Sequence, residues 1–445
     1  MSLSTNNQMQ VLMDVNNLQY SPPIDGSLSN TRQLKKYAYS PQVYSAGGAP
    51  QMQINSGGDY VSGPTSFTIF ALQVKAFLVD GTTPTTAGWN KVGASSSIGA
   101  NGSAFNLIRE HQISHRSGDV IDRTDSLNSL IAELVRYAFD SSYSEKFAKV
   151  FGYGDTSDLV ARGKIVYALP MFLFSGLYAQ KALIPSHLIA GARLKLQLES
   201  AKVALVSNVL TNVVTYEISD MNLVLDSIDL FDAAKKSLME QASNTRTQGL
   251  QYPFYSWFQL RKTSSDTSLN FDINLSAAKT MILLIKSRPS DIIDEAKSQV
   301  HNSMACDVYP YTRWRARIGS HTMPQHEIES TAESYIVTQE AFSANPDRDM
   351  LFPTSVNCGV GYDTYSSPNL DDGTANEIVS TAIVAISMEK NTIVALSGEL
   401  TNATRLLNFT ATLKNMVLGT SRVFDGYVKH LRVANCMLDN VVIDK

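Results

Sequence analysis

The sequence has little charge for its length. Charged residues make up 18% of its 445 residues, whereas an ordinary soluble domain has about 25%. This shortage indicates that much of the surface is covered when the protein works. Lysine and arginine number 37 against 41 for aspartate and glutamate, giving a formal net charge of −4. Such a chain lacks the broad basic face that wraps nucleic acid, so we expect no sequence-specific binding of nucleic acid.

The sequence also has few cysteines. All three lie in its C-terminal third, at Cys306, Cys358 and Cys436. An odd number argues against a disulfide framework and favours buried free thiols in a reducing compartment. The first ten residues lack the basic start and apolar stretch of a secretory signal, so we expect the glycosylation sequons to be unused. These sequons begin at Asn101, Asn274, Asn402 and Asn408.

No apolar run has the length of a bilayer span. The longest, residues 165–179, is interrupted by Pro170 and Ser175. It falls short of the ~20 residues that a transmembrane helix needs, so we expect no such helix.

What the sequence does have points to β structure. Hydrophobic residues reach 44%, and Ser, Thr and Asn dominate the polar remainder, as is usual for turns and half-buried strands. Residues 66–78 form a β-branched and aromatic run that stops at the turn pair Asp80-Gly81, and residues 193–199 alternate leucines with polar side chains. Both patterns predict strands, the second with one buried face.

The two halves of the chain repeat an architecture. In each half, strand-like segments are interrupted by one helix and one long irregular segment. The helices are predicted over 125–139 and 327–342, and the irregular segments cover 81–103 and 353–376. Asp125 suits the N-cap of the first helix. Loop and helix come in opposite order in the two halves, which cannot be aligned residue by residue, so the repeat is one of architecture only.

We interpret the first fifty residues as an arm. They are rich in Asn, Gln, Ser and Pro, carry spaced tyrosines and show no sustained period. Their few charges are far from those of an arginine-rich arm that binds RNA. Such a composition cannot build a core, whereas the tyrosines offer anchors for another surface. We therefore expect the arm to dock on protein neighbours.

The templates of nucleotide binding and nucleophilic catalysis fail at their spacing. Gly152-x-Gly154 lacks a third glycine and the strand-to-helix context of a dinucleotide site. No G-x-S-x-G elbow occurs, because the glycines that flank residues 94–98 are too far apart. We expect plain loops at both places, and hence no catalytic residue, no cofactor-binding residue and no enzyme activity.

The metal-binding templates fail as well. His321 and His326 lie on either side of Met323-Pro324, which precludes the single helix face of a zinc site. Asp371-Asp372 lacks the other ligands of a calcium loop and is better explained by a turn. The sequence therefore predicts no metal ligand and no cofactor.

One row of charge is unusual. Arg313, Arg315 and Arg317 alternate with apolar residues, and such a row could meet phosphate or pair with carboxylates of a neighbouring subunit. The low net basicity favours the carboxylates. The apolar residues of the alternating segments are expected in the core: Phe67, Ile69, Leu194, Leu196, Leu198, Trp314, Leu407 and Phe409.

The layout of two β units in one chain resembles the double jelly-roll major capsid proteins of icosahedral DNA viruses. NSLIAELVRYAFDSSYSEKFAKVFG looks like the helix region of their first jelly roll. ARGKIVYALPMFLFSGLYAQKALIPSHLIAGARLKLQLES and YEISDMNLVLDSIDLF look like its later strands in polinton-like viruses and virophages. RWRARIGSHTMPQHEIES, VALSGELTNATRLLNFTATL and VFDGYVKHLRVANCMLDNVVIDK look like strands of the second. The resemblance spans residues 60–445 and rests on patterns.

The resemblance implies an all-β fold of two consecutive eight-stranded jelly rolls with short inserted helices. The implied parts are an arm over 1–50, a first jelly roll over 51–232, a linker helix over 233–250 and a second jelly roll over 251–445. The implied function is that of a major capsid protein forming homotrimers of pseudo-hexagonal outline, with strands normal to the shell and long loops outside. Its partners would be other copies, neighbouring capsomers, and penton and minor capsid proteins. It would be located in the virion, after assembly inside the host cell.

Two alternatives stay open. A single jelly-roll capsid protein of a small virus, with its second half as a projection, would carry the basic arm that is absent here. A jelly-roll carbohydrate-binding module or cupin-type enzyme would need exposed aromatic side chains or a His/Glu metal set, and neither is evident in the sequence.

Overall fold

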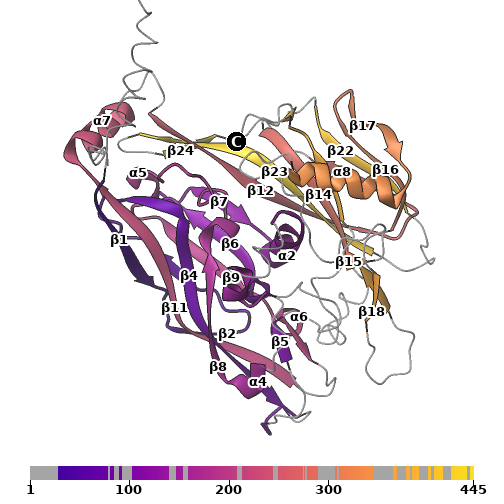
Figure 1. Cartoon of the computed structure of the whole chain (residues 1–445), viewed down its shortest axis with the longest axis horizontal. Helices are drawn as coiled ribbons and strands as arrows, with labels where there is room; N and C mark the ends of the chain where they lie inside the picture. Colours follow the sequence, from indigo (N-terminus) through magenta and orange to yellow (C-terminus); the bar gives the residue numbers. More distant parts are fainter. Residues whose placement is uncertain are drawn as a thin grey trace, which may run out of the picture.

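The computed structural model consists mainly of antiparallel strands with a few short helices (Figure 1). It describes residues 29–78, 81–84, 90–92, 103–139, 147–153, 159–207, 213–243, 249–273, 275, 278–288, 306–307, 310–343, 364–367, 377–380, 383–389, 399–401, 405–413, 422–437 and 441–444. Within these ranges the strands form two sandwiches, one from each half of the chain.

The first sandwich has one five-stranded and one four-stranded layer. One layer has the order β1 (Ser29–Ala38), β11 (Val213–Leu230), β4 (Tyr60–Phe77), β8 (Lys164–Pro170), and the short β2 (Val43–Ser45) also pairs with β11. The other has the order β3 (Gln51–Gln53), β9 (Arg193–Leu198), β6 (Ile108–Ser114), β7 (Val120–Thr124). The buried residues of β9 alternate with exposed ones, so its predicted one-sided pattern is confirmed.

The second sandwich is built in the same way. One layer has the order β12 (Leu250–Ser264), β23 (Arg422–Cys436), β14 (Ala278–Arg288), β20 (Ile383–Ser387), with β21 (Glu399–Thr401) and β24 (Val441–Asp444) added at its sides. The other has the order β13 (Ser268–Ile273), β22 (Leu407–Leu413), β16 (Tyr311–Ile318), β17 (His321–Ile328).

The two halves share one topology. When the eight main strands of each half are counted in chain order, both halves give one sheet of order 1-8-3-6 and one of order 2-7-4-5. This is the strand order of a jelly roll, in which two Greek keys form a sandwich. The predicted fold class of two consecutive jelly rolls is therefore confirmed.

The inserted helices occupy the same place in each half. Helix α2 (Leu127–Tyr137) follows β7, and α8 (Thr331–Ser343) follows β17, each after two residues. Both helices thus connect the fifth and sixth main strands. Segment 81–103 precedes α2, whereas segment 353–376 follows α8, because the two segments belong to different connections. Most of their residues lie outside the described ranges.

Two helix boundaries also differ from the prediction. Helix α2 begins after Ser126, which has a φ of 47° at the N-cap position that we had assigned to Asp125. Helix α8 begins at Thr331 and not at residue 327, because the preceding residues pair with β16 as strand β17. The linker helix expected over 233–250 is present as α7 (Asp232–Ser243), which ends earlier than expected, and Leu250 already belongs to β12. Residues 244–248 lie outside the described ranges.

The remaining elements are short. They are β5 (Asn90–Val92), η1 (Ala104–Leu107), η2 (Phe147–Phe151), α4 (Leu159–Arg162), η3 (Met171–Leu173), α5 (Ser186–Ile189), α6 (Ala201–Ala204), β10 (Leu205–Ser207), β15 (Cys306–Asp307), β18 (Thr364–Ser367) and β19 (Glu377–Ser380).

Part of the predicted arm belongs to the first jelly roll. Strand β1 pairs with β11 from Ala38↔Asn222 to Ser29↔Leu230 and is the first main strand of that sandwich. Its polar composition hid it, because an edge strand with one exposed face needs few apolar residues. Two of the spaced tyrosines, Tyr39 and Tyr44, are buried in the first core. Residues 1–28 lie outside the described ranges.

Most of the predicted core residues are buried between the layers. Leu194, Leu196, Leu198, Trp314, Leu407 and Phe409 are confirmed as core residues. Phe67 and Ile69 are not core residues: they pair with Val224 and Asn222 of β11 on the outward face of the first sheet and are half-buried. The register places Phe70 and Leu72 of β4 inside instead, since a slip of one residue exchanges the two faces of a strand. Cys436 is a buried free thiol.

Candidate functional site

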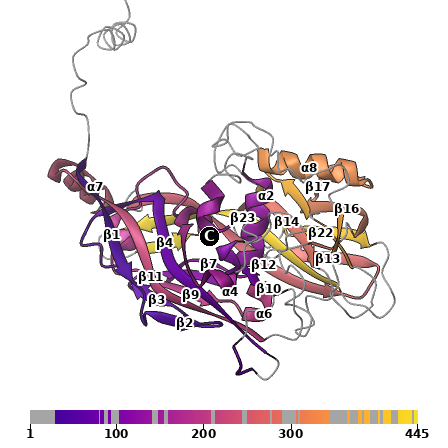
Figure 2. The same cartoon turned by 60° about the horizontal axis from the view of Figure 1, so that its bottom comes forward.

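The two sandwiches meet at helix α2, which lies between them (Figures 1 and 2). Leu127, Ile131 and Val135 pack in the first core, whereas Leu130 and Tyr137 pack in the second. A helix that is buried on all sides must bury its polar residues too. The junction therefore contains paired polar groups.

The centre of the junction is an ion pair with no exposed surface. Nζ of Lys286 on β14 lies 2.8 Å from Oε1 of Glu133 on α2, and both side chains are 0% exposed. A buried charge is tolerated when a partner and further hydrogen bonds replace its hydration. The pair fixes α2 against the outward face of the β12-β23-β14-β20 sheet.

The start of α2 is bound by the same sheet. Arg261 on β12 donates from Nη2 to Oγ of Ser126 at 3.1 Å and from Nε to Oδ1 of Asp425 on β23 at 2.8 Å. The hydroxyl of Tyr427 donates to the carbonyl oxygen of Ser126 at 3.2 Å. Ser126 is held in a left-handed conformation, so these contacts fix the chain where it enters the helix.

A second buried carboxylate joins the sandwiches beside α2. Asp122 on β7 accepts hydrogen bonds from Ser175 and from Ser256 on β12. Burial raises the pKa of Asp122, and the serine hydrogen bonds and the nearby charge of Arg432 oppose that effect. Arg432 donates to the carbonyl oxygen of Ile121 at 2.7 Å.

The backbone of Gly176 in the first sandwich lies too close to that of Tyr255 in the second for any side chain at position 176. A Cβ atom on Gly176 would lie 2.2 Å from the carbonyl oxygen of Tyr255. Tyr252 and Phe254 of β12 extend into the first core. The two sandwiches are therefore packed directly against each other, in addition to being connected through α7.

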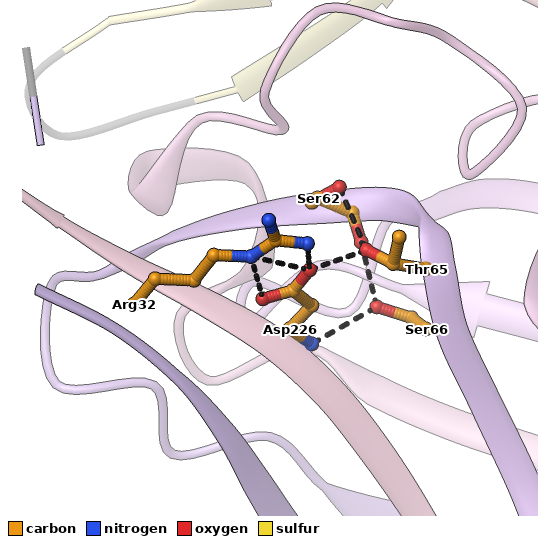
Figure 3. A network of polar contacts seen from close by, with 5 residues as sticks. All are labelled: Arg32, Ser62, Thr65, Ser66 and Asp226. Carbon is orange, nitrogen blue, oxygen red and sulfur yellow. Dashed lines mark hydrogen bonds and ion pairs between the residues drawn. The ribbon is translucent and has the colours of Figure 1, made fainter. Parts of the chain in front are cut away.

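The first strand carries its own polar network (Figure 3). Arg32 on β1 bonds to the carboxylate of Asp226 on β11, with Nε 2.9 Å from Oδ1. Thr65 and the backbone amide of Asp226 complete the network, the amide donating to Ser66 Oγ at 3.2 Å. The hydrogen bond from Arg32 holds the pKa of Asp226 below its usual range.

This network repeats the Arg261–Asp425 pair of the second sandwich. In each half an arginine on the first main strand bonds to an aspartate on the eighth, and the two aspartate side chains are 2% and 0% exposed. The two arginines differ in one respect, because Arg261 also reaches the start of a helix from the other sandwich.

The predicted arginine row is paired within the chain. Nη1 of Arg313 and Nη1 of Arg315 lie 3.4 and 3.3 Å from Glu327 on the adjacent strand β17. Both arginine side chains stay more than half exposed, so the expected pairing with carboxylates of a neighbouring subunit stays a prediction. Arg317 lines a surface hollow of ≈ 620 Å³ together with His321 and Arg405.

The other sequence candidates do not come together. His326 pairs with Glu333 at the start of α8, away from the hollow that His321 lines. Among the described residues, no three His, Cys, Asp or Glu side chains lie close enough to hold a metal ion. Gly152 ends η2 in a left-handed conformation, whereas Gly154 and residues 371–373 lie outside the described ranges. In the part of the chain that the structure describes, no helix is long and apolar enough to cross a membrane.

Sequence reasoning missed the junction residues. One signal for Glu133 was present, because it is the sole charged residue in the stretch 127–135, where apolar residues occur on every side of the predicted helix. Such a helix is usually buried all round, which would have predicted a buried partner for the carboxylate. Lys286 directly follows the apolar run 281–285, so its position at the end of a buried strand also indicated a buried charge that needs a partner.

Comparison with known proteins identifies the fold. No protein-family model matches the chain, and no curated protein matches it. The major capsid protein of Faustovirus is similar in structure with a TM-score of 0.64 at 6% identity, over 95% of this chain and 94% of that chain. A chain of the Sputnik virophage has a TM-score of 0.59 at 10% identity, over 96% of this chain and 90% of that one. The mavirus major capsid protein has a TM-score of 0.53 at 10% identity, over 96% and 92% of the two chains. The chain thus has the double jelly-roll fold of these proteins along nearly its whole length.

Proposed function

We propose that this chain is a major capsid protein that assembles into homotrimeric capsomers of an icosahedral virion shell. In this proposal the protein is structural, its partners are other copies and the remaining capsid proteins, and no catalytic step is assigned to it. The division into a first jelly roll, a connecting segment that contains α7 and a second jelly roll that begins with β12 is part of the proposal.

The observation that carries the proposal is the repeated strand order. Two jelly rolls of identical topology in one chain, joined at a rigid junction, supply two similar building blocks per copy. Three copies would place six such blocks in a ring of pseudo-hexagonal outline. The three capsid chains with similar structures extend over nearly the same length, and the low charge of 18% suits a surface that is covered by neighbours.

The two alternatives have less support. A single jelly-roll capsid protein would have a different second half, but the second half here is itself a jelly roll. A cupin-type enzyme would need a His/Glu metal set, and the described residues contain no cluster of His, Cys, Asp or Glu that could hold a metal ion.

The mass of the purified protein in solution tests the proposal. Light scattering should give a particle of three times 48.7 kDa, and negative-stain microscopy should show a near-hexagonal outline. A monomer that persists up to concentrations of tens of micromolar at physiological salt would contradict the proposal, because obligate assemblies bury large interfaces.

A further inference from the structure

The outward face of the sheet in the second sandwich is covered from within the chain. On β14, Ile282, Leu284 and Lys286 lie on the face opposite the β13-β22-β16-β17 sheet, and they are 5%, 0% and 0% exposed. Helix α2 of the first sandwich covers them through Glu133, and Arg261 at the side of this face binds the start of α2. The second sandwich therefore shows how a helix that connects the fifth and sixth main strands packs on a sheet of order 1-8-3-6.

The corresponding face of the first sheet is largely exposed, although Ala71, Val224 and Pro170 on it are buried. Its outward residues form three cross-strand rows: Val43, Ser219, Ala71 and Val166; Ala38, Asn222, Ile69 and Ala168; Lys36, Val224, Phe67 and Pro170. We call these twelve residues the open face. Val43 and Val166 are 51% and 60% exposed. An apolar patch of this kind, bordered by lysines, is typical of an interaction surface.

The corresponding helix of the second sandwich is also uncovered on one side. The inner side of α8 is bonded to its own sandwich, because Trp314 donates to Ser334 at 3.2 Å and the Ala385 amide donates to Thr338 at 3.1 Å. On the outer side, Ala332, Ile336 and Glu340 are exposed, Ile336 by 65%. In α2 the outer side is buried against the second sheet.

The uncovered helix side and the open face cannot meet within one copy. Helix α8 and the β1-β11-β4-β8 sheet lie on opposite sides of the molecule in both views (Figures 1 and 2). In the junction, α2 packs on the β12-β23-β14-β20 sheet. Their counterparts, α8 and the β1-β11-β4-β8 sheet, do not pack on each other within one copy.

We propose that the outer side of α8 in one copy binds the open face of the next copy, in the manner in which α2 binds the second sheet. This inference rests on the proposed capsomer and names the surface that builds it. The contact is head-to-tail, so it joins two different surfaces, and three copies related by a threefold rotation would close into a ring. Each ring would then alternate the junction inside a copy with the same type of contact between copies.

The repeated arginine supports this arrangement. Arg32 takes the place in the first sheet that Arg261 takes in the second (Figure 3). As Arg261 reaches Ser126 before α2, Arg32 is placed to reach Ser330 before α8 of the next copy.

Two exposed substitutions test the contact from its two sides. Ile336→Glu should damage the helix side and Val166→Glu the sheet side, and each should weaken association by at least about 30-fold, as expected for a central apolar contact. Met239→Glu is the matched control, since Met239 is an exposed apolar residue, 54% accessible, on helix α7. Circular dichroism should be unchanged in all three, because none of these residues is in a core.

A mixture of the two variants makes the test specific for a head-to-tail contact. Each variant alone should be monomeric by light scattering, whereas an equimolar mixture should form dimers and stop there, since it retains one intact helix and one intact sheet. Wild-type-like trimers from both variants would overturn this surface and leave the proposed function standing. A monomeric wild-type protein would overturn both, and a mixture that stays monomeric would overturn the head-to-tail pairing.

Discussion

The first and second sandwiches have the same strand order, yet they bury their inserted helices differently. Helix α2 is enclosed between the two sandwiches, whereas α8 is packed on one side and exposed on the other. The sequences reflect this, since α2 combines a single buried carboxylate with apolar residues all round, while α8 places polar residues and one isoleucine outside. This difference in burial is the observation from which we propose a contact between copies.

Breaking the junction should have the largest effect on stability. Lys286→Ala leaves the Glu133 carboxylate buried without its partner, and such a loss typically lowers the free energy of unfolding by about 3–5 kcal/mol. The measurement is urea unfolding followed by circular dichroism at constant protein concentration. Lys75→Ala is the control, because Lys75 pairs with Glu217 at 3.1 Å while both side chains are about 40% exposed, and exposed pairs contribute under about 1 kcal/mol.

The double variant Glu133→Leu with Lys286→Met sharpens this test. Removing both charges together should recover most of the lost stability, because the desolvation penalty disappears with the attraction. Equal losses for Lys286→Ala and Lys75→Ala would show that the junction is no more important than a surface pair.

The fourth main strand of each sandwich buries an aromatic ring that contains nitrogen, and the two rings differ in their hydrogen bonding. In the second sandwich, Trp314 on β16 donates from its indole nitrogen to Ser334. In the first sandwich, His111 on β6 packs with its ring centroid 5.5 Å from that of Phe174, and neither ring nitrogen has a hydrogen-bond partner among the described residues. Burial lowers the pKa of His111 to about 3, so the folded protein keeps this imidazole neutral.

This histidine should make the stability fall in acid. Between pH ~6.5 and about 3 the unfolded chain binds a proton at this site and the folded chain does not, so the free energy of unfolding decreases as the pH falls, by up to ~1.4 kcal/mol per pH unit. His111→Phe should reduce that slope in urea unfolding measured from pH 7 to pH 4. An unchanged slope in His111→Phe would contradict the prediction.

The sequence predicted what depends on local pattern and missed what depends on distant pairing. Alternation placed Leu194 and Trp314 inside correctly, because a strand with one buried face must alternate. The same reasoning failed for Phe67 and Ile69, since an apolar residue on a sheet is equally suited to a core and to an outward face that a partner covers. Strand β1 was missed because its partner β11 lies nearly two hundred residues away.

The repeated Arg–Asp pair could not be predicted for a similar reason. Arg32 and Asp226 are ordinary surface residues in the sequence, and only the register of β1 on β11 brings them together. The presence of two jelly rolls was predictable from a resemblance of patterns, whereas the junction required coordinates, because its ion pair joins residues 153 positions apart.

The smallest expected effect on stability concerns the ion pair between Arg32 on β1 and Asp226 on β11. Asp226→Asn keeps the shape of the side chain and removes the charge that faces Arg32, so it should lower stability by about 1 kcal/mol, the contribution of a partly exposed charged hydrogen bond. Because the pKa of Asp226 is depressed in the folded state, the wild-type advantage is present above the ordinary aspartate value of ~4 and is lost as the pH falls through the folded value. The stability curves of variant and wild type should therefore converge in strong acid.

Hydrogen exchange should distinguish the two Arg–Asp pairs. In Asp226→Asn the loss of amide protection should lie in β1. Asp425 is the fully buried counterpart and also orients Arg261 toward Ser126, so Asp425→Asn should reduce the protection of amides on both sides of the junction. A loss of protection confined to β12 in Asp425→Asn would show that the two pairs hold only their own strands, and that the second pair has no part in joining the sandwiches.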